Sequence, residues 1–274
     1  MTQDFNEKVK VMTDVYRFQP FPGRSVEQMP VLLRSDPART PVTVYRVLER
    51  RTSKSGNPDR AVFIDNCFTT GDQFIMDPSG SGEVKALNYE HEVAQALAKE
   101  LKSVSQLVDW SFPVGNDLYQ SLQGDHVYVF PASVVTRLRN NPYDCVKERE
   151  AFWEFAVRGE ISVFQDNLKL QQERGKSIEN SMGVYVPDAK GMRLVWVGSV
   201  GGNGSASSSN DLNGNSGRLL GELAPEVLEA QKKTQQTGNI ETLLGKGTDV
   251  GNGLVVIKRD QITEEEYLSL TRKQ

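Results

Sequence analysis

The sequence predicts one α+β core in which an antiparallel sheet of hairpin-linked strands is packed by amphipathic helices. Between residues 42 and 87, short apolar stretches alternate with turn residues, as in strands that are joined by hairpin loops. Between residues 88 and 108, apolar side chains recur at steps of three and four, which is the pattern of a helix with one apolar face. A chain of 274 residues can bury such a core without disulfides or metals.

Residues 1–41 are expected to form an extended arm, because they carry five prolines and no helical period survives between them. Proline removes a backbone donor and pushes the residue before it out of the helical region. An arm of this kind would lie across a neighbouring subunit. The five prolines are Pro20, Pro22, Pro30, Pro37 and Pro41.

The α+β core is expected over residues 42–197, with the helix at 88–108 covering the hairpin sheet. Phe152, Trp153 and Phe155 stand close together in a helical stretch, which is typical of core packing. The expected strands are 42–48, 61–68, 73–76, 83–87, 127–130, 183–186 and 193–197, and the further helices are 132–139, 144–157 and 161–174.

Residues 198–217 are rich in Gly, Ser and Asn, and this composition predicts a flexible loop or linker. We place the one domain boundary there. Residues 218–274 are expected to form a helix-strand-helix segment that packs on the core. Its strand is predicted at 254–257, and Thr263 with Glu266 forms a capping box for the last helix.

Net charge and hydropathy limit the classes of partner and the cellular compartment that we expect. The net charge is −4, so no whole-molecule field gathers nucleic acid or anionic lipid. The longest apolar runs, at 194–197 and 254–257, are far shorter than a membrane span. The first residues mix acids and bases without an apolar stretch, so we expect a cytoplasmic protein, or a virion protein if the source is viral.

Cysteines and histidines are too few and too scattered to predict a metal centre. Cys67 and Cys145 are expected to be small buried hydrophobic residues, and His91 and His126 surface residues. We therefore predict no cofactor.

One alternative is a metal-dependent nuclease. Asp65, Asp77, Glu83 and Lys85 surround a predicted turn, and together they resemble the PD-(D/E)xK nuclease pattern. In such a site two acids hold Mg²⁺ while the lysine orients water or stabilises the transition state.

A second alternative is a nucleic-acid-binding subunit of a ribonucleoprotein. Arg46, Arg50, Arg51 and Lys54 would lie along the first predicted hairpin and contact phosphates there.

The leading hypothesis is a non-catalytic structural or assembly subunit of a larger complex, such as a phage-type virion. It depends on the lack of a recognisable catalytic motif, on the proline-rich arm and on the Gly/Ser/Asn tract. Under this hypothesis the partners are other protein subunits, and the protein is oligomeric.

Overall fold

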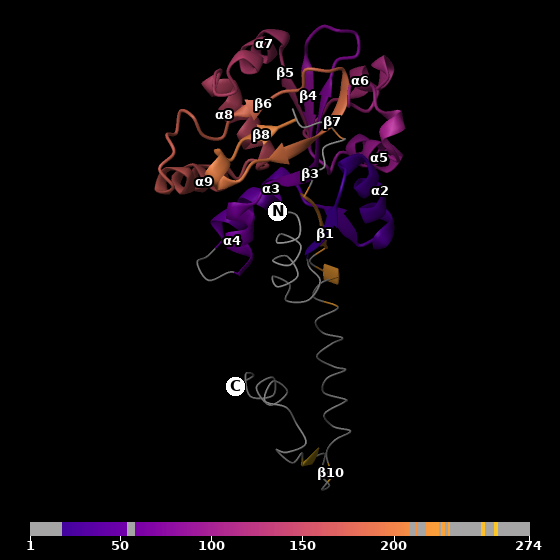
Figure 1. Cartoon of the computed structure of the whole chain (residues 1–274), viewed down its shortest axis with the longest axis vertical. Helices are drawn as coiled ribbons and strands as arrows, with labels where there is room; N and C mark the ends of the chain where they lie inside the picture. The colour runs from indigo at the N-terminus through magenta and orange to yellow at the C-terminus, as the bar shows by residue number, and fades with distance from the viewer. Residues whose placement is uncertain are drawn as a thin grey trace. The chain divides into compact units, whose positions relative to one another are not determined.

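The computed structural model describes residues 18–53, 58–208, 212, 218–224, 226–227, 230, 248–249 and 255–256. The chain divides into two compact units, residues 1–223 and 224–274, which are treated separately below. Figure 1 shows the first unit as a sheet with helices around it, so the predicted α+β class is confirmed.

The first unit is built on a nine-stranded sheet with the order β1-β9-β3-β7-β8-β6; β2 also pairs with β9, and β4 bridges β3 and β5. Most neighbouring strands are antiparallel, but β3 with β9 and β6 with β8 are parallel pairs. The sheet is therefore mixed and not purely antiparallel as expected. The strands are β1 (Phe18–Pro22), β2 (Arg39–Pro41), β3 (Phe68–Met76), β4 (Val84–Leu87), β5 (Val127–Phe130), β6 (Val184–Tyr185), β7 (Gly191–Val197), β8 (Ala206–Ser207) and β9 (Arg218–Leu223).

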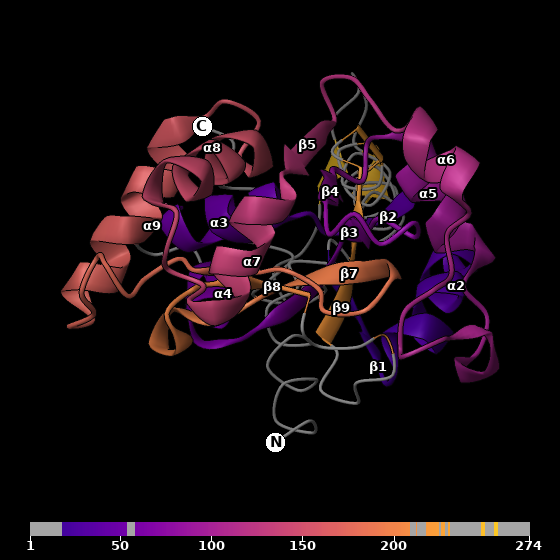
Figure 2. The same cartoon turned by 90° about the horizontal axis from the view of Figure 1, so that it is seen from above.

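Helices cover both faces of this sheet, and Figure 2 shows the two helical layers on either side of β3. Phe74 points into a core formed with α3, α4, α7, α8 and α9, whereas Ile75 points into a core formed with α2, α5 and α6. The helices are α2 (Ser25–Ser35), α3 (Val44–Thr52), α4 (Pro58–Asp65), α5 (Glu92–Glu100), α6 (Asn116–Ser121), α7 (Ala132–Asn140), α8 (Val146–Ala156) and α9 (Ile161–Glu173), with 3₁₀ turns η1 (Val104–Gln106) and η2 (Val200–Gly202).

The described part of residues 1–41 is not the expected extended arm. It contributes two strands to the sheet and a helix, α2, whose buried Val26, Met29 and Leu32 recur at steps of three. This apolar face outweighs the hydrogen bond that Pro30 removes inside the helix. Pro20, Pro22 and Pro41 lie in β1 and β2, two short strands that pair only with β9. A missing backbone N–H donor is tolerated on such strands.

The hairpin predicted between residues 42 and 68 does not form either. Residues 44–52 form α3, because the Thr43 hydroxyl accepts from the Arg46 backbone N–H and caps the helix. Val44, Val47 and Leu48 then share one buried face. Residues 58–65 form α4, so the first long strand, β3, begins only at residue 68.

The helix predicted at 88–108 is confirmed over a shorter range, Glu92–Glu100. Its buried residues are Ala94, Leu97 and Ala98, of which only Leu97 belongs to the predicted apolar stripe; Val108, at the end of that stripe, is 61% exposed. A capping box between Ser103 and Gln106 starts a separate 3₁₀ turn, which ends the regular helix.

The Gly/Ser/Asn tract is partly structured. Residues 198–208 contain η2 and strand β8, and only residue 212 of the following stretch is described. Residues 218–223 form β9 within the first unit and not the start of a C-terminal segment. In the second unit, β10 (Thr248–Asp249) pairs with β11 (Val255–Val256), which matches the predicted strand at 254–257; the capped helix lies outside the described residues.

A buried arginine joins three segments of the first unit. Arg51 is 0% exposed, and its guanidinium donates to the carbonyls of Phe63, Asn66 and Gly198. Burial lowers the pKa of Arg51 to about 10. The side chain thus ties α3 to the end of α4 and to the segment that follows β7.

Arg51→Met should lower the free energy of unfolding by about 3 kcal/mol or more, because three buried carbonyls would lose their donor. Urea unfolding measures this change. Arg137→Met is the control: Arg137 forms an exposed ion pair with Asp144, so its loss should change the stability much less than the loss of Arg51. Equal losses in the two variants would contradict the proposed role of Arg51.

Candidate functional site

The acidic residues of the predicted nuclease set lie in different surroundings. Asp65 ends α4 on the surface and pairs with Arg174 at 3.8 Å. Asp77 follows β3 and is buried, and its carboxylate accepts from the backbone N–H and the hydroxyl of Ser79 at 2.8 and 2.6 Å. Within the described ranges, no group of three or more His, Cys, Asp and Glu side chains is placed to hold a metal ion.

Glu83 and Lys85 do come together, around Tyr119 of α6. The Lys85 Nζ lies 4.4 Å from the centre of the Tyr119 ring and donates to the carbonyls of Tyr119 and Leu122, at 3.0 and 3.1 Å. The Tyr119 hydroxyl donates to Glu83 at 2.9 Å. Burial and the adjoining Glu83 raise the pKa of Tyr119. Lys85 therefore satisfies the end of a helix, and nuclease activity stays a prediction that this geometry does not favour.

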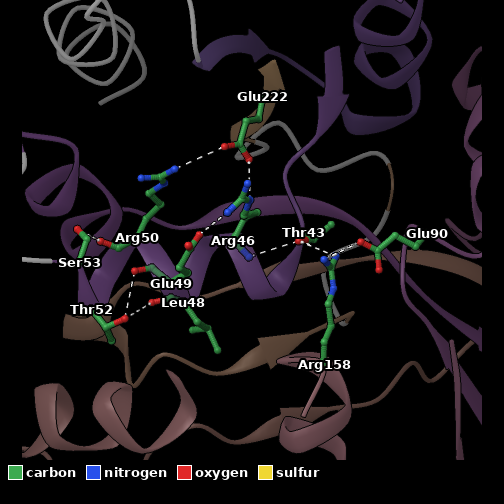
Figure 3. A network of polar contacts seen from close by, with 10 residues as sticks. All are labelled: Thr43, Arg46, Leu48, Glu49, Arg50, Thr52, Ser53, Glu90, Arg158 and Glu222. Carbon is green, nitrogen blue, oxygen red and sulfur yellow. Dashed lines mark hydrogen bonds and ion pairs between the residues drawn. The ribbon is translucent and has the colours of Figure 1, made fainter. Parts of the chain in front are cut away.

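The predicted nucleic-acid residues are spread over different environments as well. Figure 3 shows Arg46 and Arg50 of α3 converging on Glu222 of β9, at 3.3 and 3.7 Å, with Arg46 also 2.7 Å from Glu49. Arg51 is buried against backbone carbonyls, and Lys54 lies outside the described residues. Arg46 and Arg50 join α3 to β9, and the hairpin on which the prediction placed these residues does not form, because residues 44–52 are helical. Phosphate binding stays a prediction.

A second polar contact in Figure 3 joins three separate parts of the chain. Arg158, just after α8, pairs with Glu90 at 2.6 Å and donates to the Thr43 hydroxyl at 3.4 Å. Its guanidinium also lies 5.0 Å from the ring centre of Tyr45. The Arg158 guanidinium therefore links the end of α8 to the segment before α5 and to the start of α3.

Asp72 lies beneath this contact, on the bulged part of β3. Its carboxylate accepts from the backbone N–H groups of Val44 and Tyr89 at 2.6 and 2.8 Å. Burial raises the pKa of Asp72 to about 6, although both hydrogen bonds act in the opposite direction.

A groove of about 500 Å³ opens beside Glu90 and Thr43. Its walls come from the end of α2, from β2 and from α5, and they combine apolar and polar side chains. Such a volume falls in the range of ligand and side-chain pockets. The lining residues that matter below are Leu33, Pro37, Arg39, Thr40, Pro41 and Lys99.

The most unusual surface feature is a two-residue turn between η1 and α6. Val108 and Ser111 exchange two backbone hydrogen bonds of 2.9 Å, so Asp109 and Trp110 form the tip. Both tip residues have left-handed backbones, with φ of 49° and 61°. Asp tolerates this region, but a Trp there is strained by about 1–2 kcal/mol. Val108 is 61% exposed and Trp110 is 49% exposed.

A buried arginine holds this turn in place. Arg193 of β7 is 4% exposed and donates to the Ser111 hydroxyl at 2.8 Å, to the Asp109 carbonyl at 3.0 Å and to the Ser208 carbonyl at 3.2 Å. Its Nη1 also lies 3.1 Å from the Asp188 carboxylate. The exposed Trp110 is therefore presented on a fixed backbone and not on a loose loop.

Sequence reasoning missed both features. The apolar spacing places residues 104 and 108 in one continuous helix, which hides the turn, and the local sequence places Arg193 only in a strand. One signal was available. That signal is Asp109, because Asp favours turns and tolerates a left-handed backbone.

Lys85→Met should lower the free energy of unfolding by about 2 kcal/mol, because two buried helix-end carbonyls would lose their donor. Thermal unfolding measures the loss, and Lys147→Met on exposed α8 surface is the control. The same samples are tested for Mg²⁺-dependent DNA cleavage. If wild type cleaves DNA, and Lys85→Met abolishes cleavage at unchanged stability, then the structural role of Lys85 is wrong.

Asp72 should make stability depend on pH. Its pKa rises from 3.8 to about 6 on folding, so the folded state binds this proton more tightly than the unfolded chain does. The resulting stabilisation is complete below about pH 4 and is lost as the pH rises through about 6. Relative to Asp72→Asn, which does not titrate, wild type should lose about 3 kcal/mol across this window. Urea unfolding at stepped pH measures the difference, and parallel curves for the two proteins would contradict it.

Comparisons of the chain with protein-family models, with curated proteins and with solved structures gave no match. Among the described residues, no helix is long and apolar enough to cross a membrane.

Proposed function

We propose that this protein is a non-catalytic assembly subunit that binds other protein subunits through the turn at Val108–Ser111. The single observation that carries the proposal is Trp110, which is half exposed, left-handed and held by Arg193. Strained residues persist where the surrounding structure fixes them, and they cluster at functional sites.

About half of the Trp110 side chain stays exposed to solvent in the folded unit. The turn needs positive φ at both tip residues, for which Asp-Gly is a favoured pair. The sequence has Asp-Trp instead, next to the exposed Val108. Tryptophan is the residue most enriched at the energetic centres of protein interfaces, and a rigid backbone reduces the entropy lost on binding.

The alternatives receive less support from the same structure. Lys85 donates to helix-end carbonyls, and Arg46 and Arg50 share the carboxylate of Glu222. These contacts give Lys85, Arg46 and Arg50 structural roles. The structure therefore supports the nuclease and the nucleic-acid-binding alternatives less than it supports a protein-binding subunit.

The variant Trp110→Gly tests binding through the turn without a large change in the free energy of unfolding. Glycine relieves the left-handed strain while the partly buried ring is lost, so the free energy of unfolding should stay within about 1 kcal/mol of wild type. The native mass is measured by light scattering for the purified protein and by native electrophoresis of extracts from its source. Wild type should exceed its chain mass of 30.5 kDa in at least one of these settings, and Trp110→Gly in neither.

Ile178→Ala is the matched control, because Ile178 is another exposed apolar side chain of the first unit, at 45%. This variant should associate like wild type. The proposal fails if wild type stays at the mass of one chain in both settings, or if Trp110→Gly associates as wild type does.

A further inference from the structure

The groove and the turn are complementary features of the same unit. The groove is concave, has about 500 Å³ of space and has apolar walls at Leu33, Pro37 and Pro41. The turn is convex and presents Trp110 beside Val108. An indole ring and one neighbouring aliphatic side chain would fit in this volume, and burial of an aromatic ring is the largest apolar gain a single side chain offers.

The rim of the groove and the turn also carry opposite charges. Lys99 of α5 lines the groove and is exposed, and it makes no ion pair within the described part of the chain. Arg39 also lines the groove, but it is 5% exposed and its guanidinium donates to the Gly221 carbonyl at 3.0 Å. On the turn, Asp109 is exposed next to Trp110, and its carboxylate has no ion-pair partner among the described residues. Insertion of Trp110 would bring the carboxylate of Asp109 towards Lys99 at the rim.

Glu90 is the one acid in the groove, and it is already paired with Arg158 at 2.6 Å. Its charge is therefore largely compensated, so among the described lining residues the exposed charge without an ion-pair partner is that of Lys99. A salt bridge at such a rim contributes more to orientation and to the rate of association than to affinity.

We infer that the partner is a second copy of this chain, whose Val108–Ser111 turn inserts Trp110 into the groove lined by Leu33, Thr40 and Lys99. This inference rests on the proposed function and names its partner. The turn and the groove are different surfaces, so the contact is heterologous, and repeated copies join head to tail into a ring or a filament.

The head-to-tail arrangement predicts complementation between two defective variants. Trp110→Gly keeps the groove and loses the turn. The double variant Thr40→Glu with Lys99→Glu keeps the turn and places two acids opposite Asp109, at positions that are exposed and so tolerate the change. Each variant alone should remain at the mass of one chain.

An equimolar mixture of the two should form a one-to-one heterodimer with twice the mass of one chain, because one intact turn meets one intact groove. Wild type should form larger species whose mass rises with concentration. Light scattering over a concentration series measures all four samples, and circular dichroism confirms that both variants are folded.

Three results would overturn the inference, and they differ in what they say about the proposed function. If wild type associates by itself but the mixture does not, the contact between copies uses other surfaces. If purified wild type stays at one chain while its extract shows a larger species that needs Trp110, the partner is a different protein and the proposed function stands. If Trp110→Gly associates as wild type does, both fail.

Discussion

The fold depends on one constraint, the burial of β3 on both faces. All nine residues of Phe68–Met76 are buried, although the strand contains polar side chains. Two of these side chains donate to neighbouring carbonyls: the Thr70 hydroxyl to Val195 at 2.9 Å, and the Gln73 amide nitrogen to Ala94 at 2.7 Å. Helices can therefore pack on both sides of β3 without leaving these donors unpaired.

The bulge in β3 links this buried strand to the surface. Between Thr69 and Gln73 the pairing with β7 is interrupted, which turns Asp72 towards two backbone N–H groups. Gly71 is required there because a Cβ would lie 2.7 Å from the rings of Pro41 and Tyr89. The bulge thus fixes the start of α3 and the segment before α5, which form two sides of the groove.

Part of this could be predicted from the sequence. The α5 helix and the β3–β4 pairing follow from local apolar periodicity, and both were found. The α3 helix was not, because residues 42–48 alternate in a way that fits a strand, and their helical state depends on the Thr43 cap and on distant partners such as Glu222. The turn at Trp110 depends on Arg193, which is more than 80 residues away in the chain. No local pattern encodes a support at that separation.

The pairing of the outermost strands has a consequence for synthesis of the protein. Phe18 of β1 lies opposite Glu222 of β9, and Arg39 of β2 lies opposite Leu223, so the first and last strands of the unit complete one another. The ribosome must release almost the whole unit before β9 can join. Until then β1 and β2 lack their pairing partner and β3 lacks one of its neighbours, and such long-range closure is slow. The nascent chain therefore passes through a stage with open strand edges, when chaperones or early assembly partners would have their greatest effect.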